Sequence, residues 1–147
     1  MSGINVFIAS AEKEIYRGKA NMLIASTSNG EIAVLPGHAP LLAILKPSEI
    51  RILCESENHT SSCTPMDIIV HGGFLEVQPE SVTILADTVE RAEDINAAQV
   101  KKALAQAKQQ MLSPDKNIAS KALLDLELAI AKLQLLRRTS KQSLLKP

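Results

Sequence analysis

The sequence is poor in aromatic side chains: its 147 residues include no Trp, one Tyr and two Phe. Recognition of single-stranded nucleic acid by base stacking is therefore not expected. No run approaches the roughly 18 apolar residues that a membrane-spanning helix needs. The N-terminus lacks a basic segment followed by a long apolar one, so no secretory signal is predicted. We expect a soluble, cytoplasmic protein with an aliphatic core, which meets a membrane only through a partner.

Cysteine is scarce as well. Cys54 and Cys63 flank a polar run that is typical of a hairpin loop. This would place them on neighbouring strands, where a disulfide is geometrically conceivable, but in a reducing cytoplasm we expect two free thiols and no disulfide. Because the sequence offers no second cysteine pair and no nearby histidine pair, no metal site is predicted.

A catalytic constellation is missing too. His38, His59 and His71 fall in separate predicted loops or strand ends, without metal-binding spacing and without a Gly-x-Ser-x-Gly elbow. Phosphate-loop and dinucleotide fingerprints are absent. An acidic cluster at residues 90–94 precedes a predicted helix start, where carboxylates interact favourably with the helix dipole. No enzyme and no cofactor are predicted; a catalytic centre would require His38, His71 and an acidic residue to converge in one pocket.

Charge is balanced overall but not along the chain. Residues 1–90 hold five Lys and Arg against eleven Asp and Glu, while residues 91–147 hold eleven against five. The two parts therefore carry formal charges of −6 and +6. The zero net charge argues against a nucleic-acid partner, yet the chain is an electrostatic dipole in sequence.

Residues 4–87 consist of short β-branched runs separated by Gly, Pro, Asn and Ser, a pattern typical of an antiparallel sandwich or barrel. Two turns are predicted at Ser28-Asn29-Gly30 and Pro36-Gly37, and Gly72-Gly73 predicts a close backbone approach or a bulge. The predicted strands cover residues 6–10, 15–19, 21–26, 31–34, 41–45, 49–55, 67–71, 74–78 and 82–86.

After residue 87 the hydrophobic period becomes helical, and Ala, Lys, Gln and Leu replace the β-branched residues. Asn96 and Gln99 predict a capping box at the start of a helix that ends near residue 112. The Ser113-Pro114-Asp115 break places Pro114 in the first turn of a second helix, which runs to about residue 138 before a frayed tail. A connection this short predicts an antiparallel helical hairpin.

The expected fold class is therefore α+β, with an antiparallel β-sandwich domain over residues 1–88 and a helical hairpin domain over residues 89–147. The second helix has two apolar ridges, and the first helix can cover one of them. The other ridge must pack on the sandwich or on another protein, because burying four such side chains contributes roughly 5 to 9 kcal/mol. The broad ridge contains Ile118, Ala119, Ala122, Leu123, Leu126, Ala129, Ile130 and Leu133, and the narrow ridge contains Leu124, Leu128, Ala131 and Leu135.

Several segments carry a family resemblance. Residues 30–42 (GEIAVLPGHAPLL), 72–77 (GGFLEV), and 82–88 (VTILADT) with 90–95 (ERAEDI) resemble, in order and spacing, the epsilon subunit of bacterial F-type ATP synthases. The resemblance continues through the helical hairpin and spans nearly the whole chain. It implies a non-catalytic rotor subunit of the central stalk, which couples proton-driven rotation of the membrane ring to the catalytic head. Such a subunit lies at the cytoplasmic face of the inner membrane, held there through the complex.

The resemblance also implies partners. A sandwich of about ten strands would sit between the gamma subunit and the ring of c subunits, and the hairpin would either fold on the sandwich or extend into the head and impede ATP hydrolysis. The implied residues for binding the ring and the stalk are Gly30, Glu31, Pro36, Gly37, His38 and Pro40. The implied inhibitory residues, which would meet the catalytic β subunits and their acidic loop, are Leu124, Leu128, Leu135, Lys132, Arg137 and Arg138.

Some members of that family bind ATP through an Ile-Asp-x-x-Arg-Ala motif at the start of the hairpin. Here Ile95 is kept, but Asn96 and Gln99 replace the carboxylate and the arginine. An amide can donate a hydrogen bond but cannot supply the charge-assisted phosphate contact that Arg makes. We expect ATP sensing to be weak or absent, and an ATP-sensing ligand-binding switch on the same scaffold is the alternative function.

Overall fold

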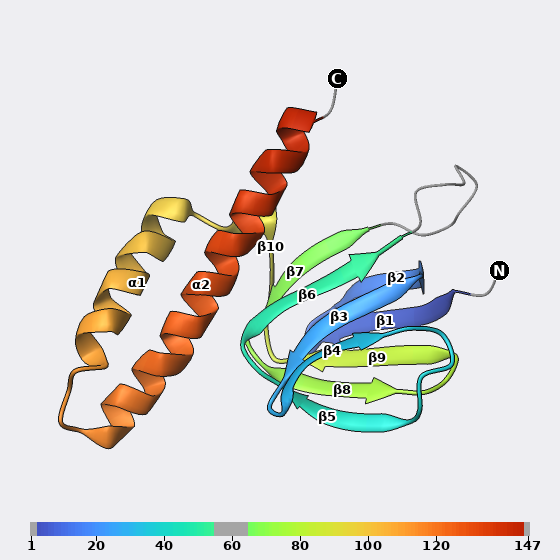
Figure 1. Cartoon of the computed structure of the whole chain (residues 1–147), viewed down its shortest axis with the longest axis horizontal. Coiled ribbons are helices and arrows are strands. Elements are labelled where there is room, and N and C mark those ends of the chain that lie inside the picture. The colour runs from blue at the N-terminus through green and yellow to red at the C-terminus, as the bar shows by residue number, and fades with distance from the viewer. Residues whose placement is uncertain (1–2, 55–64, 146–147) are drawn as a thin grey trace. The chain divides into compact units, whose positions relative to one another are not determined.

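The computed structural model describes residues 3–54 and 65–145 (Figure 1). The chain divides into two compact units, Met1–Val89 (unit 1) and Glu90–Pro147 (unit 2). Unit 1 is built from strands and unit 2 from helices, which confirms the α+β class predicted from the change of hydrophobic period.

All nine predicted strands are present in unit 1, with ends that differ from the predicted ones by at most two residues. They are β1 (Ile4–Ser10), β2 (Glu14–Ala20), β3 (Met22–Thr27), β4 (Gly30–Val34), β5 (Leu41–Leu45), β6 (Ser48–Leu53), β7 (Met66–Val70), β8 (Gly73–Val77) and β9 (Ser81–Ala86). A tenth strand, β10 (Val89–Arg91), carries the chain into unit 2 and was not predicted individually.

The strands form one sheet that folds over on itself. Its order is β10-β7-β6-β3-β5-β8-β9-β1-β2, and β4 pairs with β3 beside this path. The two halves of the sandwich are joined where β3 meets β5, in a register that contains the single pair Thr27 and Leu45. β1 pairs with β9 in parallel, from Asn5 opposite Ser81 to Ser10 opposite Ala86. The first strand of the chain therefore lies inside the sheet.

The core of unit 1 is aliphatic, as the shortage of aromatic residues predicted. Along the strands, buried and exposed positions alternate because successive side chains point to opposite faces of a sheet. Tyr16 is the aromatic member of the cluster. The buried core residues are Ile4, Val6, Ile8, Tyr16, Ala20, Leu23, Ala25, Val34, Leu45, Ile50, Ile52, Ile68, Val70, Leu75, Val77, Val82, Ile84 and Ala86.

The predicted close approach at Gly72-Gly73 is confirmed. Gly73 opens β8 with φ +134°, and it pairs with Ala86 of β9. A Cβ atom at this position would collide with the Leu85 carbonyl oxygen and would lie 2.8 Å from the Ala86 Cα atom. Both the backbone conformation and the space available therefore require glycine.

Unit 2 consists of a short 3₁₀ turn, η1 (Ala92–Asp94), and an antiparallel pair of helices, α1 (Ala97–Gln110) and α2 (Lys116–Leu145). Asn96 caps α1, because its Oδ1 atom accepts hydrogen bonds from the backbone N–H groups of Ala98 and Gln99 at 3.0 and 3.3 Å. The asparagine half of the predicted capping box is thus confirmed.

Two details of the second helix were predicted wrongly. Pro114 is not in its first turn: Asp115 supplies the cap, with its Oδ1 atom accepting from the Asn117 N–H at 2.9 Å. Residues 139–145 are not a frayed tail, since α2 continues to Leu145. The segment contains good helix formers such as Lys, Gln and Leu, which outweigh the stop signal of two preceding arginines.

Burial in unit 2 is concentrated on small side chains. The buried residues of α1 are Val100 and Ala107. In the broad ridge of α2, Ala122 and Ala129 are buried, whereas the larger Ile118, Leu123 and Ile130 are more than 40% exposed. In the narrow ridge, Ala131 and Leu135 are buried, Leu128 is half-buried and Leu124 is 46% exposed.

The expectation of free thiols is contradicted, because Cys54 is disulfide-bonded. Cys54 follows β6, and β6 pairs with β7 up to Ile52 opposite Met66. Because the two strands pair in antiparallel fashion, the residues that flank their connection lie close together, as a disulfide requires. The expectation of free thiols rested on a reducing compartment and not on this geometry. Cys63, the other cysteine of the sequence, and His59 lie outside the described residues.

Candidate functional site

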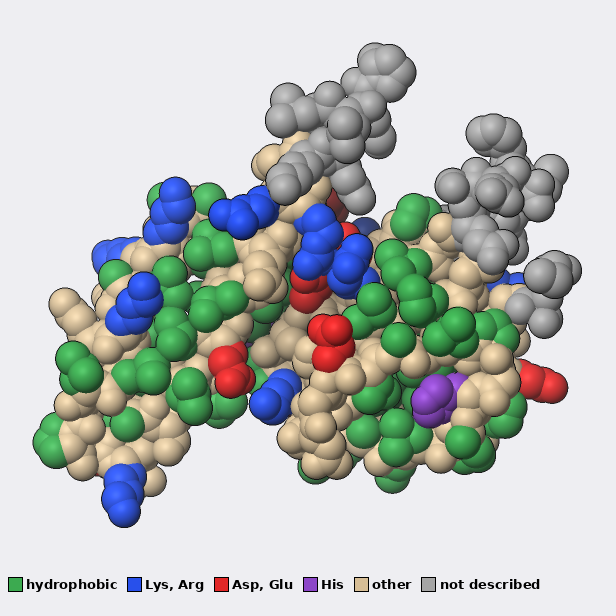
Figure 2. Space-filling model, in the orientation of Figure 1, with side chains coloured by type: hydrophobic (Ala, Val, Ile, Leu, Met, Phe, Trp, Pro, Cys, Tyr) green, Lys and Arg blue, Asp and Glu red, His purple; other side chains and the backbone are tan. Residues whose placement is uncertain are grey.

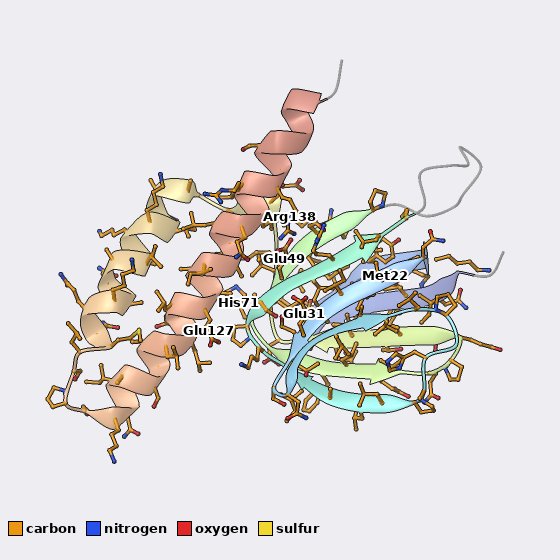
Figure 3. All side chains as sticks on the ribbon, viewed as in Figure 1. Met22, Glu31, Glu49, His71, Glu127 and Arg138 are labelled. Carbon is orange, nitrogen blue, oxygen red and sulfur yellow. The ribbon has the colours of Figure 1, made fainter. Side chains whose placement is uncertain are left out.

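The β3–β4 hairpin holds the predicted contact residues Gly30 and Glu31. Its turn is fixed by Thr27, which is 3% exposed; the Thr27 hydroxyl donates to the Gly30 carbonyl oxygen at 2.8 Å and accepts from the Asn29 N–H at 3.2 Å. Glu31 lies opposite Ser26 in the ladder and projects from β4 into solvent (Figure 3). The hairpin therefore presents a carboxylate on a rigid support.

The other predicted contact residues lie in the loop from Leu35 to Pro40. Gly37 has φ +87°, as a type II bend requires, and its N–H donates to the Pro79 carbonyl oxygen at 2.7 Å. The His38 N–H donates to the Leu35 carbonyl oxygen at 3.1 Å. The Gly37 bond ties the loop to the turn between β8 and β9, and the His38 bond closes the loop on itself.

The structure places these two groups of contact residues at opposite ends of β4. Gly30 begins the strand and Val34 ends it, so the groups are separated by roughly 13 Å of extended chain. β5 runs in the opposite direction to β4, from Leu41 near the loop to Leu45, which pairs with Thr27 of the hairpin. One strand therefore connects the two candidate contact regions.

A surface that the sequence analysis did not single out lies along this strand. Four large hydrophobic side chains are more than half exposed on the outward side of neighbouring strands: Leu42 at 74%, Ile44 at 57%, Phe74 at 55% and Leu85 at 55%. Ile44 lies opposite Phe74, and Phe74 lies opposite Leu85. We call these four residues the outer apolar face.

Hydrophobic side chains gather on the visible side of unit 1 where Figure 1 places β4, β5 and β8 (Figure 2). The sequence did contain a signal for this surface. The run from Leu41 to Leu45 is apolar at both phases of the strand, and Phe74 and Leu85 each adjoin a core residue. A strand with one solvated face would alternate instead.

The outer face continues from β9 to β1 and β2. Phe7 of β1 lies opposite Thr83 and also opposite Arg17, whose guanidinium carbon is 4.6 Å from the Phe7 ring centroid. Arg17 Nε also donates to Glu14 at 3.0 Å. This hydrogen bond lowers the pKa of Glu14 below its ordinary value of 4.5 and raises the pKa of Arg17.

Unit 2 contains a cavity of about 290 Å³ between η1, α1 and α2. Ile95, Asn96 and Gln99, the residues of the degenerate ATP motif, lie on its wall. Its lining also includes three carboxylates, Glu90, Asp94 and Asp125, and one cation, Lys132. The structure thus brings the motif residues together at a cavity, but one in which negative charge outweighs positive charge.

The six predicted inhibitory residues of α2 differ in how accessible they are. Leu124 and Arg137 are exposed, Leu128 and Arg138 are half-buried, and Leu135 is buried. Lys132 is paired with Glu90: the Nζ and Oε2 atoms are 2.7 Å apart, and the side chains are 17% and 30% exposed. Figure 2 shows more Lys and Arg than Asp and Glu on the visible face of the hairpin.

The histidine cluster that an enzyme would need is not formed in the described part of the chain. His71 precedes β8, while the loop that holds His38 is bonded to Pro79, which follows β8. The two histidines therefore lie at opposite ends of a five-residue strand. Among the described residues, no group of three His, Cys, Asp or Glu side chains could hold a metal ion.

The sequence of unit 1 matches a described protein family. Residues 3–92 match the family "ATP synthase, Delta/Epsilon chain, beta-sandwich domain". The chain belongs to the ATP synthase epsilon family. The epsilon-family relatives also extend over unit 2: an "ATP synthase epsilon chain" of Psychrobacter arcticus is 39% identical, covering 94% of this chain and 96% of its own. That of Xanthomonas campestris pv. campestris is 38% identical, covering 96% and 99%.

Solved ATP synthase structures share the fold. A chain of the Euglena gracilis mitochondrial ATP synthase, in a structure titled with OSCP, F1 and c-ring, matches with a TM-score of 0.77 and 22% identity, covering 92% of this chain and 82% of that one. A chain of the Tetrahymena thermophila enzyme, from a structure titled central stalk and c-ring, matches with a TM-score of 0.62 and 17% identity, covering 92% and 97%. The epsilon-family fold therefore persists where little sequence identity remains.

Proposed function

We propose that this epsilon-family chain is a non-catalytic rotor subunit of a bacterial F-type ATP synthase, which couples proton-driven rotation of the membrane ring to the catalytic head. The outer apolar face carries this proposal. A sandwich with a complete core has no internal use for four large hydrophobic side chains that are more than half exposed in register, and such a patch is typical of a protein-binding surface.

The proposed partner of the outer apolar face is the gamma subunit of the stalk. Fully burying a side chain of this size contributes about 1.5 to 3 kcal/mol. Because these four side chains are already about half buried, covering them would contribute roughly 3 to 6 kcal/mol to binding. The hairpin that presents Glu31 is the proposed contact with the c ring. This assignment agrees with two contact regions at opposite ends of β4, joined by β5.

The second proposed role, inhibition of ATP hydrolysis, belongs to unit 2. In the inhibitory state α1 and α2 separate and extend toward the catalytic β subunits. They would reach about 21 and 45 Å for 14 and 30 residues at 1.5 Å per residue. The formal charge of +6 on residues 91–147 would guide them to acidic partners.

The proposed location is the cytoplasmic face of the inner membrane. In the described residues, no helix has the length and apolar character needed to cross a bilayer. The outer apolar face and Glu31 instead provide protein contacts, through which the complex would hold the chain at the membrane.

Reconstitution tests both roles. The full chain is added to a bacterial catalytic head that contains gamma but lacks its own epsilon subunit, and bound protein and ATP hydrolysis are measured together. We expect Ile44→Ser and Phe74→Ser to weaken binding at least tenfold, while Lys13→Ser, an exposed residue of the turn between β1 and β2, leaves it unchanged. A chain ending at Glu93 should bind but not inhibit. Equal binding by all variants would overturn the gamma assignment, and inhibition by the short chain would overturn the role of the hairpin.

The ATP-sensing alternative has one observation in its favour: Ile95, Asn96 and Gln99 do line a cavity. The three carboxylates of that cavity oppose it, because they repel a polyphosphate and because the cation Lys132 is already paired. We therefore keep the expectation that ATP sensing is weak or absent. Calorimetric titration of the isolated protein with ATP checks it, and a micromolar dissociation constant would favour the alternative.

A further inference from the structure

The ion pair between Glu90 and Lys132 joins two separate parts of unit 2. Glu90 is the first residue of the unit, and Lys132 lies in the middle of α2. The pair is short, at 2.7 Å, and neither side chain is more than a third exposed. Solvent and salt therefore screen it less than they screen a surface pair such as Arg17 with Glu14, whose side chains are 68% and 48% exposed.

The surroundings of Lys132 strengthen its attachment. Glu90, Asp94 and Asp125 line one cavity with it, and Asp125 lies seven residues earlier on the same face of α2. Among the described lining residues of this cavity, Lys132 is the one cation. Without the charge of Lys132, the described lining of this cavity would hold three carboxylates and no cation.

We propose that the Glu90–Lys132 pair is a latch that keeps α2 docked on the start of unit 2 in the compact hairpin, and that Lys132 exchanges this carboxylate for a partner's carboxylate when the hairpin extends. The latch rests on the proposed function, since it assumes an extended inhibitory state. Lys132 cannot pair with Glu90 and with a partner's carboxylate at the same time, so pairing with one weakens pairing with the other. Loss of Glu90 releases the cation, whereas loss of Lys132 removes both contacts.

The two single substitutions therefore have different consequences. Glu90→Gln should favour the extended hairpin and strengthen inhibition of ATP hydrolysis, because Lys132 becomes available to the acidic partner. Lys132→Gln should also loosen the hairpin but should not strengthen inhibition. The double charge reversal Glu90→Lys with Lys132→Glu should restore the compact hairpin, because it rebuilds the pair with opposite polarity.

Hydrogen exchange of the full-length isolated protein measures the latch without reference to the synthase. We expect exchange of the α1 amides to rise about three- to tenfold in each single variant, and to return to within about twofold of the original in the charge-reversed pair. Glu93→Gln, an exposed carboxylate of η1, is the matched control and should change nothing. The β9 amides of unit 1 provide an internal reference for an intact fold.

Each outcome decides one of the two proposals. Unchanged exchange in both single variants overturns the latch, as does failure of the double reversal to restore protection. If exchange rises as expected but the variants inhibit a reconstituted catalytic head equally, the latch stands and the inhibitory role of the hairpin is overturned.

Discussion

The two units bury side chains of different size. In unit 1 the core consists mainly of Ile, Leu and Val, and most of these are fully buried. Among the residues of unit 2 whose burial the structure describes, 90–140, four of the six buried ones are alanines, while Ile118, Leu123, Leu124 and Ile130 stay more than 40% exposed. Because each buried methylene contributes about 0.8 kcal/mol, the hairpin gains far less from its own packing than the sandwich does. Packing within the hairpin therefore contributes less to stability than packing within the sandwich.

The largest expected effect is in the sandwich core. Ile84→Ala removes a fully buried side chain of β9 and should lower the free energy of unfolding by about 2 to 5 kcal/mol. Ala129→Gly in α2 should cost only about 1 kcal/mol. Urea unfolding followed by circular dichroism, with hydrogen exchange to assign the unit, measures both. The comparison fails if Ala129→Gly lowers the stability of unit 1 as well.

Backbone geometry gives the next effect. Gly73→Ala meets both a φ of +134° and the Leu85 carbonyl oxygen, whereas Gly30→Ala meets a φ of +121° with open space around it. We expect Gly73→Ala to cost at least about 2 kcal/mol and Gly30→Ala about 1 kcal/mol. Thermal unfolding of the two variants isolates the cost of the collision. Equal losses would mean that β9 moves aside freely.

A substitution at the N-cap of α1 tests whether the hairpin can be destabilised without affecting unit 1. Asn96→Ala removes the acceptor for two N–H groups of α1 and should destabilise that helix by about 1 kcal/mol. Exchange of the α1 amides should rise about fivefold, while exchange in unit 1 stays constant. Asn96→Asp keeps the acceptor and serves as the control; a rise of the same size there would exclude loss of the cap as the cause.

The smallest effect concerns the exposed pair of Glu14 and Arg17. Since the folded pKa of Glu14 is lowered below 4.5, its contribution to stability is present above that value and is lost as the pH falls through the lowered pKa. Glu14→Gln should therefore melt slightly below the original protein at neutral pH, and the two melting curves should converge in acid. A difference that grows in acid would contradict this sign.

The sequence predicted the sandwich well for two reasons. Nine of its strands are short β-branched runs, and these runs are separated by Gly, Pro, Asn and Ser, which favour turns. β10 and η1 escaped individual prediction because Val89–Arg91 and Ala92–Asp94 are too short and too polar for a period to emerge. The end of α2 was missed because Arg137 and Arg138 suggested a terminus, although Thr139 remains in the helix and donates its hydroxyl hydrogen to the Leu135 carbonyl oxygen at 2.9 Å.

The candidate site was harder to predict than the fold. Glu31 and His38 could be selected from a motif, but their separation along β4 depends on pairing between strands. The outer apolar face requires knowing that Ile44, Phe74 and Leu85 lie in one row, which the register decides. The latch requires a contact between residues 42 positions apart, Glu90 and Lys132, which no local period encodes.

The parallel pairing of β1 with β9 has a consequence for synthesis of the chain. Asn5 lies opposite Ser81, so the first strand emerges long before its neighbour. At roughly 5 to 20 residues per second, a ribosome needs about 4 to 15 s to cover this stretch. During that time β1 is paired with β2 on one side only, and its other side has no partner. The side chains of Ile4, Val6 and Ile8 stay exposed until the rest of the core is made.

The helices of unit 2 have no such delay, because their contacts lie close together in the sequence. A nascent chain that stalls before residue 86 would therefore hold an unclosed sheet with an open edge along β1, the kind of surface that recruits chaperones or other strands. The strand that is synthesised first is therefore among the last to complete its pairing.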